Sequence, residues 1–328
     1  MTILLTGATG GLGYRTLEQF IRNDQIVKII ATGRSIKPTH LVEHSKVSYI
    51  LGDLEDSDFV SKLVEQVDCI VHAAALSSPW GKYSAFEIAN VFTMKNLINA
   101  AKKHKIKRFV YVSTPSLYYN GNSRFDIKES DELPKNFINA YSKTKYQAEL
   151  ELEKSGISYI ILRPRALIGR GDMIIMPRLI RAFQEGKLKV IGDGNNIVDL
   201  TSLANVADAI ELSLFVGAEG MNQTYNITNG EPVKLWDTID KVLSLLGYQM
   251  NKQKIPYFIL KLIAQMMELK SKLTNYQEPA LTLYSVGILA KSMTIDISKA
   301  RKLLGYTPRV STDEAITEFV NWYKGVNS

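Results

Sequence analysis

The sequence predicts an α/β protein in which a doubly wound parallel sheet is joined to a smaller, mostly helical C-terminal lobe. In the first half of the chain, short apolar runs alternate with segments of helical periodicity. The apolar runs are nearly continuous, as expected for strands that helices cover on both faces. A glycine-rich segment separates the first run from the first helical segment. Such strand–helix alternation favours parallel strands joined by right-handed crossovers.

Six strands are expected in the first domain, which we place at residues 1–163. They are Ile3–Leu5, Val27–Ala31, Val47–Leu51, Cys69–His72, Phe109–Val112 and Tyr159–Leu162. Hydrophobic periodicity distinguishes them from the helical segments between them. These segments include Leu12–Arg22, Asp58–Glu65 and Val91–Lys103.

After Pro164 helices and loops dominate, so residues 164–328 are expected to form mainly a substrate-binding lobe. One later strand, near residues 225–228, is expected to return to the sheet of the first domain. The polar segment 118–136 is predicted to be a long loop, and long loops in compact domains often act as lids.

Composition places the chain among ordinary globular proteins. It has 40 Lys and Arg residues against 33 Asp and Glu, but the basic residues are spread thinly and favour no nucleic-acid partner. The single cysteine, Cys69, excludes a disulfide within the chain. No apolar run is long enough for a membrane span, and the histidines lack metal-ligand spacing. We therefore expect a cytoplasmic protein with a small-molecule partner, no metal site and no membrane span.

The first predicted strand leads into Thr6-Gly7-Ala8-Thr9-Gly10-Gly11-Leu12-Gly13, and a helix follows directly. Glycines allow a tight turn and let backbone N–H groups approach a pyrophosphate beside the positive end of the helix. The spacing differs from G-x-G-x-x-G, but its place between a strand and a helix indicates nucleotide binding. The candidate cofactor-binding residues here are Gly7, Thr9, Gly10, Gly11, Leu12 and Gly13.

The Thr-Gly-x-x-Gly-x-x-Gly pattern resembles the glycine motif of extended short-chain dehydrogenases, which belong to the NAD-dependent epimerase/dehydratase superfamily. Further segments match that family in the expected order: Gly52-Asp53-Leu54, His72-Ala73-Ala74-Ala75, Val112-Ser113-Thr114 and Tyr141-x-x-x-Lys145. Later matches are Arg163-Pro164, Gly192-Asp193-Gly194 and Asn205-Val206-Ala207. The resemblance implies a Rossmann domain, an NAD(P) cofactor and oxidoreductase activity.

The resemblance also implies which further residues lie beside the cofactor. In this chain the matching positions are Asp53, Leu54, Ala73, Ala74, Ala75, Asn90 and Pro164. By the same resemblance, the carboxylate of Asp53 contacts the adenine amino group. The three small alanine side chains leave room for the cofactor.

The end of the second strand bears on the choice between NAD and NADP. Sites that prefer NAD usually place an acid there for the ribose 2′-hydroxyl, whereas this strand ends Ala31-Thr32-Gly33-Arg34. Arg34 could form a bidentate pair with a 2′-phosphate and stack on adenine. An exposed arginine is also common at a strand end. The pattern favours NADP, with NAD as the alternative.

Tyr141 and Lys145 are four residues apart on a predicted helix and therefore project from one face. A free tyrosine has a pKa of about 10, which makes it a poor acid or base at neutral pH. A neighbouring ammonium favours the phenolate, so the pair suits proton transfer that accompanies hydride transfer. The resemblance implies that Lys145 also binds the nicotinamide ribose.

Thr114 is the candidate for the hydroxyl that holds the substrate oxygen, at a place where the family usually has a serine. Threonine keeps the required donor and acceptor. Tyr118 then holds the tyrosine place of the family motif, whereas Tyr119 replaces its glycine. Asn90 matches a family asparagine, and either steadies the helix backbone near Lys145 or caps a helix.

The second lobe is expected to set the substrate. Family members that act on nucleotide sugars usually carry an arginine for the diphosphate shortly after Gly-Asp-Gly, and Val198 stands at that place here. Other segments look like the 3β-hydroxysteroid dehydrogenase branch, among them Gly169-x-Gly171-Asp172 and Glu278-Pro279-Ala280-Leu281-Thr282. That branch implies a hydrophobic 3-oxo or 3-hydroxy substrate, sterol-like or long-chain.

Several alternatives stay open at this stage. The apolar segment 255–269 is expected to be a core-packing helix, the wall of a lipophilic pocket, or an interfacial membrane contact. Arg165 and Arg170 either hold an acid group of the substrate or are surface charges. The rival functions are a nucleotide-sugar epimerase or dehydratase and an NADP-sensing protein without activity. Family members often pair through the helices that here carry Asn90 and Tyr141, which implies a homodimer.

Overall fold

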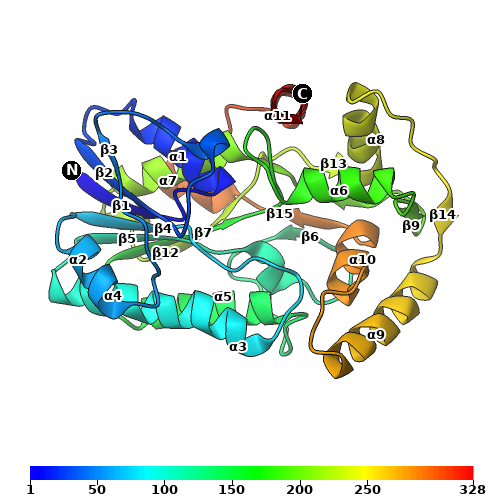
Figure 1. The fold of residues 1–328 in the computed structure, drawn as a ribbon, viewed down its shortest axis with the longest axis horizontal. Coiled ribbons are helices and arrows are strands. Elements are labelled where there is room, and N and C mark those ends of the chain that lie inside the picture. The colour runs from blue at the N-terminus through cyan, green and yellow to red at the C-terminus, as the bar shows by residue number, and fades with distance from the viewer. Residues whose placement is uncertain (328) are drawn as a thin grey trace.

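A seven-stranded parallel sheet forms the centre of the computed structural model, which describes residues 1–327 (Figure 1). Its strands lie in the order β12-β7-β5-β4-β1-β2-β3, and every neighbouring pair is parallel. The doubly wound sheet predicted from the sequence is therefore confirmed. Its strands are β1 (Thr2–Thr6), β2 (Lys28–Thr32), β3 (Val47–Tyr49), β4 (Cys69–His72), β5 (Arg108–Val112), β7 (Tyr159–Pro164) and β12 (Gln223–Ile227).

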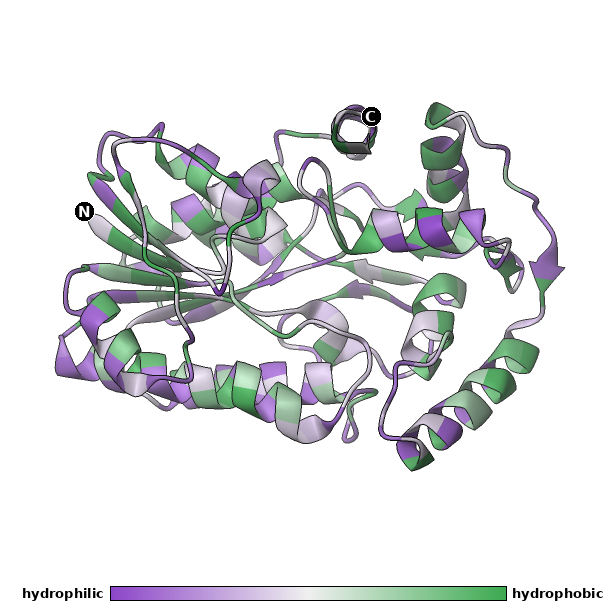
Figure 2. Cartoon of the chain, in the orientation of Figure 1, coloured by the Kyte–Doolittle hydropathy of each residue, from purple (hydrophilic) through white to green (hydrophobic). Residues whose placement is uncertain are grey.

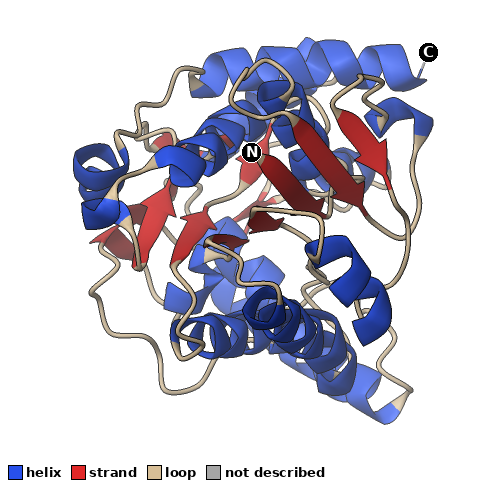
Figure 3. Cartoon of the chain, turned by 90° about the vertical axis from the view of Figure 1, so that its left-hand side faces the viewer, coloured by secondary structure: helices blue, strands red, loops and turns tan. Residues whose placement is uncertain are grey.

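Successive residues of each strand enter different cores, because side chains alternate between the two faces of a sheet. In β1, Ile3 and Leu5 enter one core and Leu4 enters the other. The first core is covered by α1 (Gly11–Phe20) and α7 (Leu203–Phe215). The second is covered by α2 (Ser57–Val64), α4 (Thr93–Lys103) and α5 (Ala140–Glu153). Figures 1 and 3 show the strands between these two groups of helices.

The central strands create the crevice in which a ligand can bind. β1 lies between β4 and β2, because the chain runs from β1 to β2 and β3 on one side and then crosses back to β4 on the other side. The carboxyl ends of β1 and β4 are neighbours, with Thr6 in register with His72. In open α/β sheets, ligands bind outside the carboxyl ends of the strands at this switch point.

The second lobe contains more strands than the sequence suggested. A four-stranded sheet has the order β13 (Val233–Lys234), β10 (Ile197–Val198), β15 (Met293–Ile295) and β6 (Arg124–Ile127). Two-stranded pairs join β11 (Thr201–Ser202) to β8 (Leu167–Ile168) and β14 (Lys254–Ile255) to β9 (Val190–Ile191). Strands of two to four residues are too short to produce a recognisable hydrophobic period.

The helices of this lobe surround a separate core that includes Trp236, Ile316 and Phe319. They are α6 (Ile175–Gln184), α8 (Leu235–Leu245), α9 (Tyr257–Leu273), α10 (Leu283–Ala290) and α11 (Thr312–Asn327). The remaining short helices are η1 (Pro38–His40), α3 (Tyr83–Phe86), η2 (Glu87–Phe92), η3 (Pro115–Tyr118), η4 (Ala218–Gly220) and η5 (Ala300–Leu304).

The segment 118–136 differs from the irregular loop that was predicted. Its residues 124–127 form strand β6, which pairs in parallel with β15. Tyr118, Tyr119 and Ile127 are buried in a cluster with residues of β15. The prediction of a long loop was wrong for this part, because the partner strand lies about half the chain away and leaves no trace in the local pattern.

Helix α9 contains most of the apolar segment 255–269. Leu260 and Ala264 are buried in the core of the second lobe, whereas Phe258, Leu262 and Met266 are exposed. The prediction of a core-packing helix therefore holds for only one face of α9. Within residues 1–327, no helix combines the length and the apolar character needed to cross a bilayer.

Candidate active site

The glycine-rich loop lies against the strand next to β1. Gly7 has φ +71°, in the left-handed region that favours glycine, and a Cβ there would lie 2.7 Å from the Ala74 nitrogen. Ala73 donates from its backbone N–H to the Thr6 carbonyl oxygen, and the Ala74 N–H donates to the Thr6 hydroxyl. Ala73 and Ala74 are half-buried and Ala75 is exposed. The loop and the alanine segment thus form adjoining parts of one site.

The N-terminus of α1 has the properties of an anion site. Gly10 is its exposed N-cap, no side chain caps the helix, and the first turn contains no acidic residue. The first N–H groups of a helix have no partner within the helix, so they can bind a pyrophosphate. Gly11 and Leu12, in the first turn, are half-buried. These observations agree with a dinucleotide at this position.

A loop of the second lobe meets the same helix end. A Cβ on Gly11 would lie 2.1 Å from the Gly171 carbonyl oxygen. Asp172 follows, and its carboxylate accepts hydrogen bonds from the N–H groups of Ile174, Ile175 and Met176 at the start of α6. Gly171 was matched to a family segment in the sequence, but its contact with the glycine-rich loop required the tertiary structure.

The side chains expected at the adenosine end lie around the carboxyl ends of β2 and β3. A Cβ on Gly33 would lie 2.4 Å from the Thr9 hydroxyl, so the two segments are in close contact. Arg34 follows and is exposed, with no ion pair to any carboxylate in the described part of the chain. Asp53 is exposed and accepts a hydrogen bond from the Glu55 N–H at 3.0 Å. Leu54 is half-buried beside it.

Lys145 is buried between α5 and the central sheet, with 1% of its surface exposed. Its amine donates to the Val112 carbonyl oxygen at 2.6 Å and lies 4.1 Å from the centre of the Tyr111 ring. Burial lowers the pKa of Lys145 to about 7, against the opposing effect of the Glu149 carboxylate. Asn139 orients the helix, because its side-chain oxygen accepts from the Ser142 N–H at the first turn.

The Lys145 charge also affects His72 at the end of β4. Burial, followed by the nearby Lys145, lowers the pKa of His72 to about 3, so the imidazole is neutral at physiological pH. Its Nδ1 is 2.7 Å from the Thr6 hydroxyl. His72 therefore belongs to the packing behind the glycine-rich loop.

Tyr141 lies one helical turn before Lys145 and is partly buried. Burial raises the pKa of its phenol, while a hydrogen bond with the Thr114 side chain lowers it. The phenol is thus protonated at neutral pH and lies next to the hydroxyl that was selected from the sequence. The structure brings Tyr141, Lys145 and Thr114 together at the carboxyl end of β5.

The hydroxyl chain continues beyond Thr114 into the second lobe. The Thr114 oxygen lies 2.9 Å from the Ser116 hydroxyl, which is 2.9 Å from the Tyr284 hydroxyl of α10. Sequence reasoning missed Tyr284, because a tyrosine in a helix 168 residues from Ser116 carries no local sign of its position. Tyr118, expected at the family's tyrosine place, instead donates to Asn226 from the buried cluster.

Asn90 connects three segments behind the site. Its amide nitrogen donates to the Thr144 hydroxyl at 3.1 Å and to the Leu76 carbonyl, and its oxygen accepts from the Leu76 N–H. It lies within η2, so the helix-capping alternative is wrong. Pro164, the last residue of β7, is buried and in register with Ile227.

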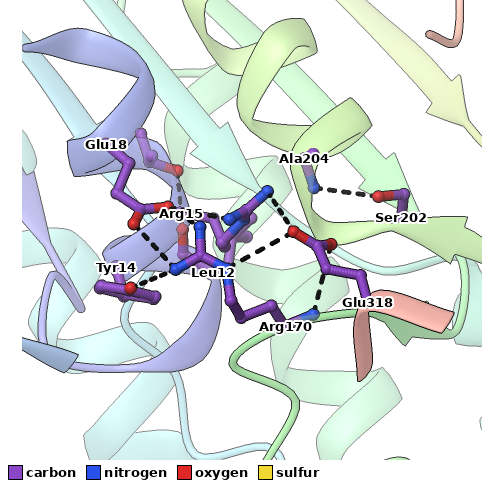
Figure 4. A network of polar contacts seen from close by, with 9 residues as sticks. Leu12, Tyr14, Arg15, Glu18, Arg170, Ser202, Ala204 and Glu318 are labelled. Carbon is purple, nitrogen blue, oxygen red and sulfur yellow. Dashed lines mark hydrogen bonds and ion pairs between the residues drawn. The ribbon is translucent and has the colours of Figure 1, made fainter. Parts of the chain in front are cut away.

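The three arginines near the end of β7 have different environments. Arg163 and Glu149 form a buried bidentate ion pair, with nitrogen–oxygen distances of 3.0 and 2.5 Å. Arg170 contacts Glu18 and Glu318 and the ring of Tyr14, which ties α1 to α11 (Figure 4). Because these acids neutralise Arg170, the expectation that it holds a substrate acid is not supported.

Arg165 contrasts with both of its neighbours. It is only 7% exposed, and its Nε has no hydrogen-bond partner in the part of the chain that the structure describes. The ionisable groups that affect its pKa are Tyr284, Asp199 and Tyr119, none of which forms an ion pair with it. Burial lowers the pKa of Arg165 without removing its charge. Residues 1–327 contain no cluster of three or more His, Cys, Asp or Glu side chains that could hold a metal ion.

We predict that Gly13→Ala destabilises the protein by about 1–3 kcal/mol, because the new methyl group would overlap the backbone of the glycine-rich loop. A Cβ there would lie 2.1 Å from the Gly7 oxygen and 2.5 Å from the Ala8 Cα. Thermal unfolding of the purified variant measures the effect. Gly10→Ala is the matched control, since its Cβ would meet only the Gly7 oxygen at 3.4 Å. Equal midpoints for the two variants would contradict the prediction.

We also predict that Lys145→Met stabilises the protein more in acid than in base. The pKa of Lys145 in the folded protein lies below the ordinary value of a lysine. Burial of the ammonium therefore lowers the free energy of unfolding in full below about pH 7, and this loss becomes smaller as the pH rises toward 10.5. The gain near pH 6 should exceed that near pH 9 by about 2–3 kcal/mol. Unfolding at both pH values measures this difference. Lys143→Met, at an exposed position of the same helix, should show none.

Comparisons with known proteins agree with this geometry. Residues 3–228 match the family model described as "NAD dependent epimerase/dehydratase family". An uncharacterised protein of Escherichia coli is 31% identical, over 99% of this chain and 98% of that protein. A 2-alkyl-3-oxoalkanoate reductase of Stenotrophomonas maltophilia is 32% identical, over 96% and 97% of the two chains. A decarboxylating sterol-4-alpha-carboxylate 3-dehydrogenase of Candida albicans is 30% identical, over 98% and 97%.

Solved structures support the fold at lower sequence identity. The UDP-glucose 4-epimerase of Thermotoga maritima superposes with a TM-score of 0.78 at 21% identity, and each chain is fully covered. The structure of gox2253 has a TM-score of 0.80 at 22% identity, over 99% of this chain and 98% of the other. The chain belongs to the NAD-dependent epimerase/dehydratase family and is an NAD(P)-dependent enzyme of the extended short-chain dehydrogenase type.

Proposed function

We propose that the protein transfers hydride between a nicotinamide cofactor and a carbonyl or hydroxyl-bearing carbon of a hydrophobic 3-oxo or 3-hydroxy compound. The observation that carries the proposal is the contact between the Tyr141 phenol and Thr114, one turn before the buried Lys145. These three side chains supply a proton donor, a hydrogen bond to the reacting oxygen and a positive charge within one small volume. When bound, the nicotinamide supplies or accepts the hydride.

The residues that would hold the cofactor lie on the first domain. The N-terminus of α1 would bind the pyrophosphate, and Arg34 would pair with a 2′-phosphate. The free guanidinium of Arg34 supports NADP as the preferred cofactor, with NAD as the alternative. Asp53 and the alanines 73–75 would line the remaining length of the dinucleotide.

The phenol of Tyr141 would donate its proton to the substrate oxygen during reduction and recover it during oxidation. Its raised pKa keeps the proton on the phenol before the reaction. Thr114 would donate a hydrogen bond to the same oxygen and so stabilise the charge that develops there. The Lys145 ammonium would stabilise the phenolate that remains.

The second lobe favours an apolar substrate over a nucleotide sugar. Val198, at the place expected for a diphosphate-binding arginine, is buried in β10 and pairs with Val233 and Met293. Two relatives of similar length are named for a 3-oxoalkanoate and a sterol carboxylate. The UDP-sugar epimerases among the solved structures, at 21–23% identity, support the fold only.

Arg165 is our candidate for the group that binds a substrate acid. Arg165 comes directly after β7, which pairs with β5. In these two strands Leu162 is in register with Val112, and Thr114 stands two residues after Val112. A buried guanidinium without a carboxylate partner is costly, and an anionic ligand would neutralise it. The names of the two relatives both contain a carboxylate. We infer that the substrate carries an acid near the reacting carbon.

The protein is expected to oxidise a long-chain 2-alkyl-3-hydroxy acid with NADP faster than with NAD, measured as NADPH formation. Tyr141→Phe should lower kcat by about 10²–10⁴-fold, since that is the usual contribution of a positioned acid or base. Tyr146→Phe, on the same helix but packed against Phe137, should keep full activity. If UDP-glucose stabilises the protein against heat while no 3-hydroxy compound is oxidised, the rival function is correct.

For Arg165→Met, we predict an increase of about 10–100-fold in KM for the 3-hydroxy acid, because a charge-assisted hydrogen bond contributes about 1.5–3 kcal/mol. The KM for the methyl ester of the same compound should not change. Thermal unfolding should show no loss of stability, since the native guanidinium has no ion pair to lose. Arg178→Met, which removes an exposed arginine, is the control. Parallel increases in KM for acid and ester would rule out a role in acid recognition.

A further inference from the structure

Helix α9 presents an apolar stripe that nothing in the described part of the chain covers. Phe258 is 71% exposed and Leu273 is 79% exposed, at the two ends of the helix. Leu262, Met266 and Leu269 lie between them and are more than half exposed. The spacing of three and four residues places these five side chains on one face of the helix. An exposed apolar patch of this kind usually marks an interaction surface.

The opposite face of α9 holds the helix to the protein. Leu260 and Ala264 are buried in the core of the second lobe. The Glu268 carboxylate accepts a hydrogen bond from the Leu283 N–H at the start of α10, and Ser271 accepts one from the Trp80 indole N–H. The stripe therefore faces outward because of these fixed contacts. Figure 1 shows α9 at the edge of the molecule, and Figure 2 shows apolar positions along it.

The charges beside the stripe are all positive. Lys261, Lys270 and Lys272 are exposed on α9, and they have no ion pairs among residues 1–327. Lys270 lies at one edge of the stripe, and the other two lysines lie at the other edge, by helical geometry. Glu268 is the one acid of the helix, and its half-buried carboxylate is bonded to the start of α10. The outward face thus combines apolar side chains with exposed lysines that form no ion pair in the described residues.

We propose that this face of α9 binds the surface of an anionic lipid bilayer. Apolar side chains on one face of a helix, with lysines at its margins, suit the boundary between acyl chains and headgroups. The lysine stems can extend so that their charges reach anionic headgroups. The amphipathic character of this 17-residue helix suits a position in the plane of the interface.

The distribution of charge favours a bilayer over a second copy of the chain. Two α9 helices that paired through their stripes would bring lysines of both copies together along the contact. Like charges at close range oppose such pairing, whereas anionic headgroups would neutralise the same lysines. A lipid surface is therefore the occupant that satisfies both the apolar stripe and its cationic margins.

Bilayer contact at α9 would bring the active site close to a source of apolar molecules. α9 packs against α10, and Tyr284 of α10 reaches the Ser116 hydroxyl at 2.9 Å. Gly287 of α10 allows the close approach of Tyr119, since a Cβ there would overlap the Tyr119 hydroxyl. One helix thus separates the lipid-binding face from the hydroxyl chain at Thr114. The bilayer interaction itself does not depend on the substrate proposed above.

Co-sedimentation of the full chain with vesicles tests the proposal. The protein should pellet with vesicles of phosphatidylcholine and phosphatidylglycerol, and binding should weaken as salt is added. Replacing Lys261, Lys270 and Lys272 by Gln should weaken binding by about 100-fold in total, at about fivefold per lysine. The double variant Leu262→Asp, Leu269→Asp should abolish it. The matched control is Leu245→Asp, at an exposed leucine of α8 in the same lobe.

All substituted side chains are exposed, so thermal unfolding should confirm that each variant keeps the fold. The proposal is overturned if the native protein fails to pellet with the anionic vesicles, or if the double aspartate variant pellets as well as the native chain. It is also overturned if light scattering reveals a dimer that the double variant dissociates while vesicles bind neither form. In that case a second copy covers the stripe.

Discussion

Burial of the Lys145 amine against the carbonyl of Val112 is the constraint on which the candidate site depends. The contact fixes α5 against the carboxyl end of β5, and the same helix then places Tyr141 beside Thr114. Burial of a cation is unfavourable, and burial lowers the pKa of Lys145 to about 7. The surrounding structure therefore has to supply compensating stability. The buried Arg163–Glu149 ion pair and the apolar cores on both faces of the sheet stabilise the same region.

The second lobe completes the site through a small number of long-range contacts. Tyr284 extends the hydroxyl chain from Thr114 and Ser116 into α10, and the Gly171 loop closes against the first turn of α1. Each lobe has its own apolar core, so these polar and backbone contacts bring two separately packed units together at the site. A substrate bound there would contact both units. This arrangement agrees with the expectation that the second lobe sets the substrate.

The apolar stripe of α9 and the guanidinium of Arg165, which forms no ion pair in the described residues, are both unfavourable in the isolated chain. Both are features that the isolated chain leaves incompletely satisfied: one is apolar surface in water, and the other is a buried cation with no ion pair and no hydrogen-bond partner at its Nε in the described residues. Exposed apolar surface and a buried cation without an ion pair both lower the stability of the isolated chain. The partner that we propose for each is a lipid surface in one case and an acidic substrate in the other. The two proposals agree with an apolar substrate that carries an acid group.

Local sequence was enough for the parallel sheet and the glycine-rich turn, and it placed Tyr141 and Lys145 on one helix. Hydrophobic periodicity identifies strands and helices, and close backbone packing at Gly7 and Gly13 allows no larger residue. The neutralised Arg170, the strand at residues 124–127 and Tyr284 at the site could not be predicted in this way. Each depends on partners more than 100 residues away along the chain. Only the folded chain brings such residues together, because no local pattern records which distant segment a side chain will meet.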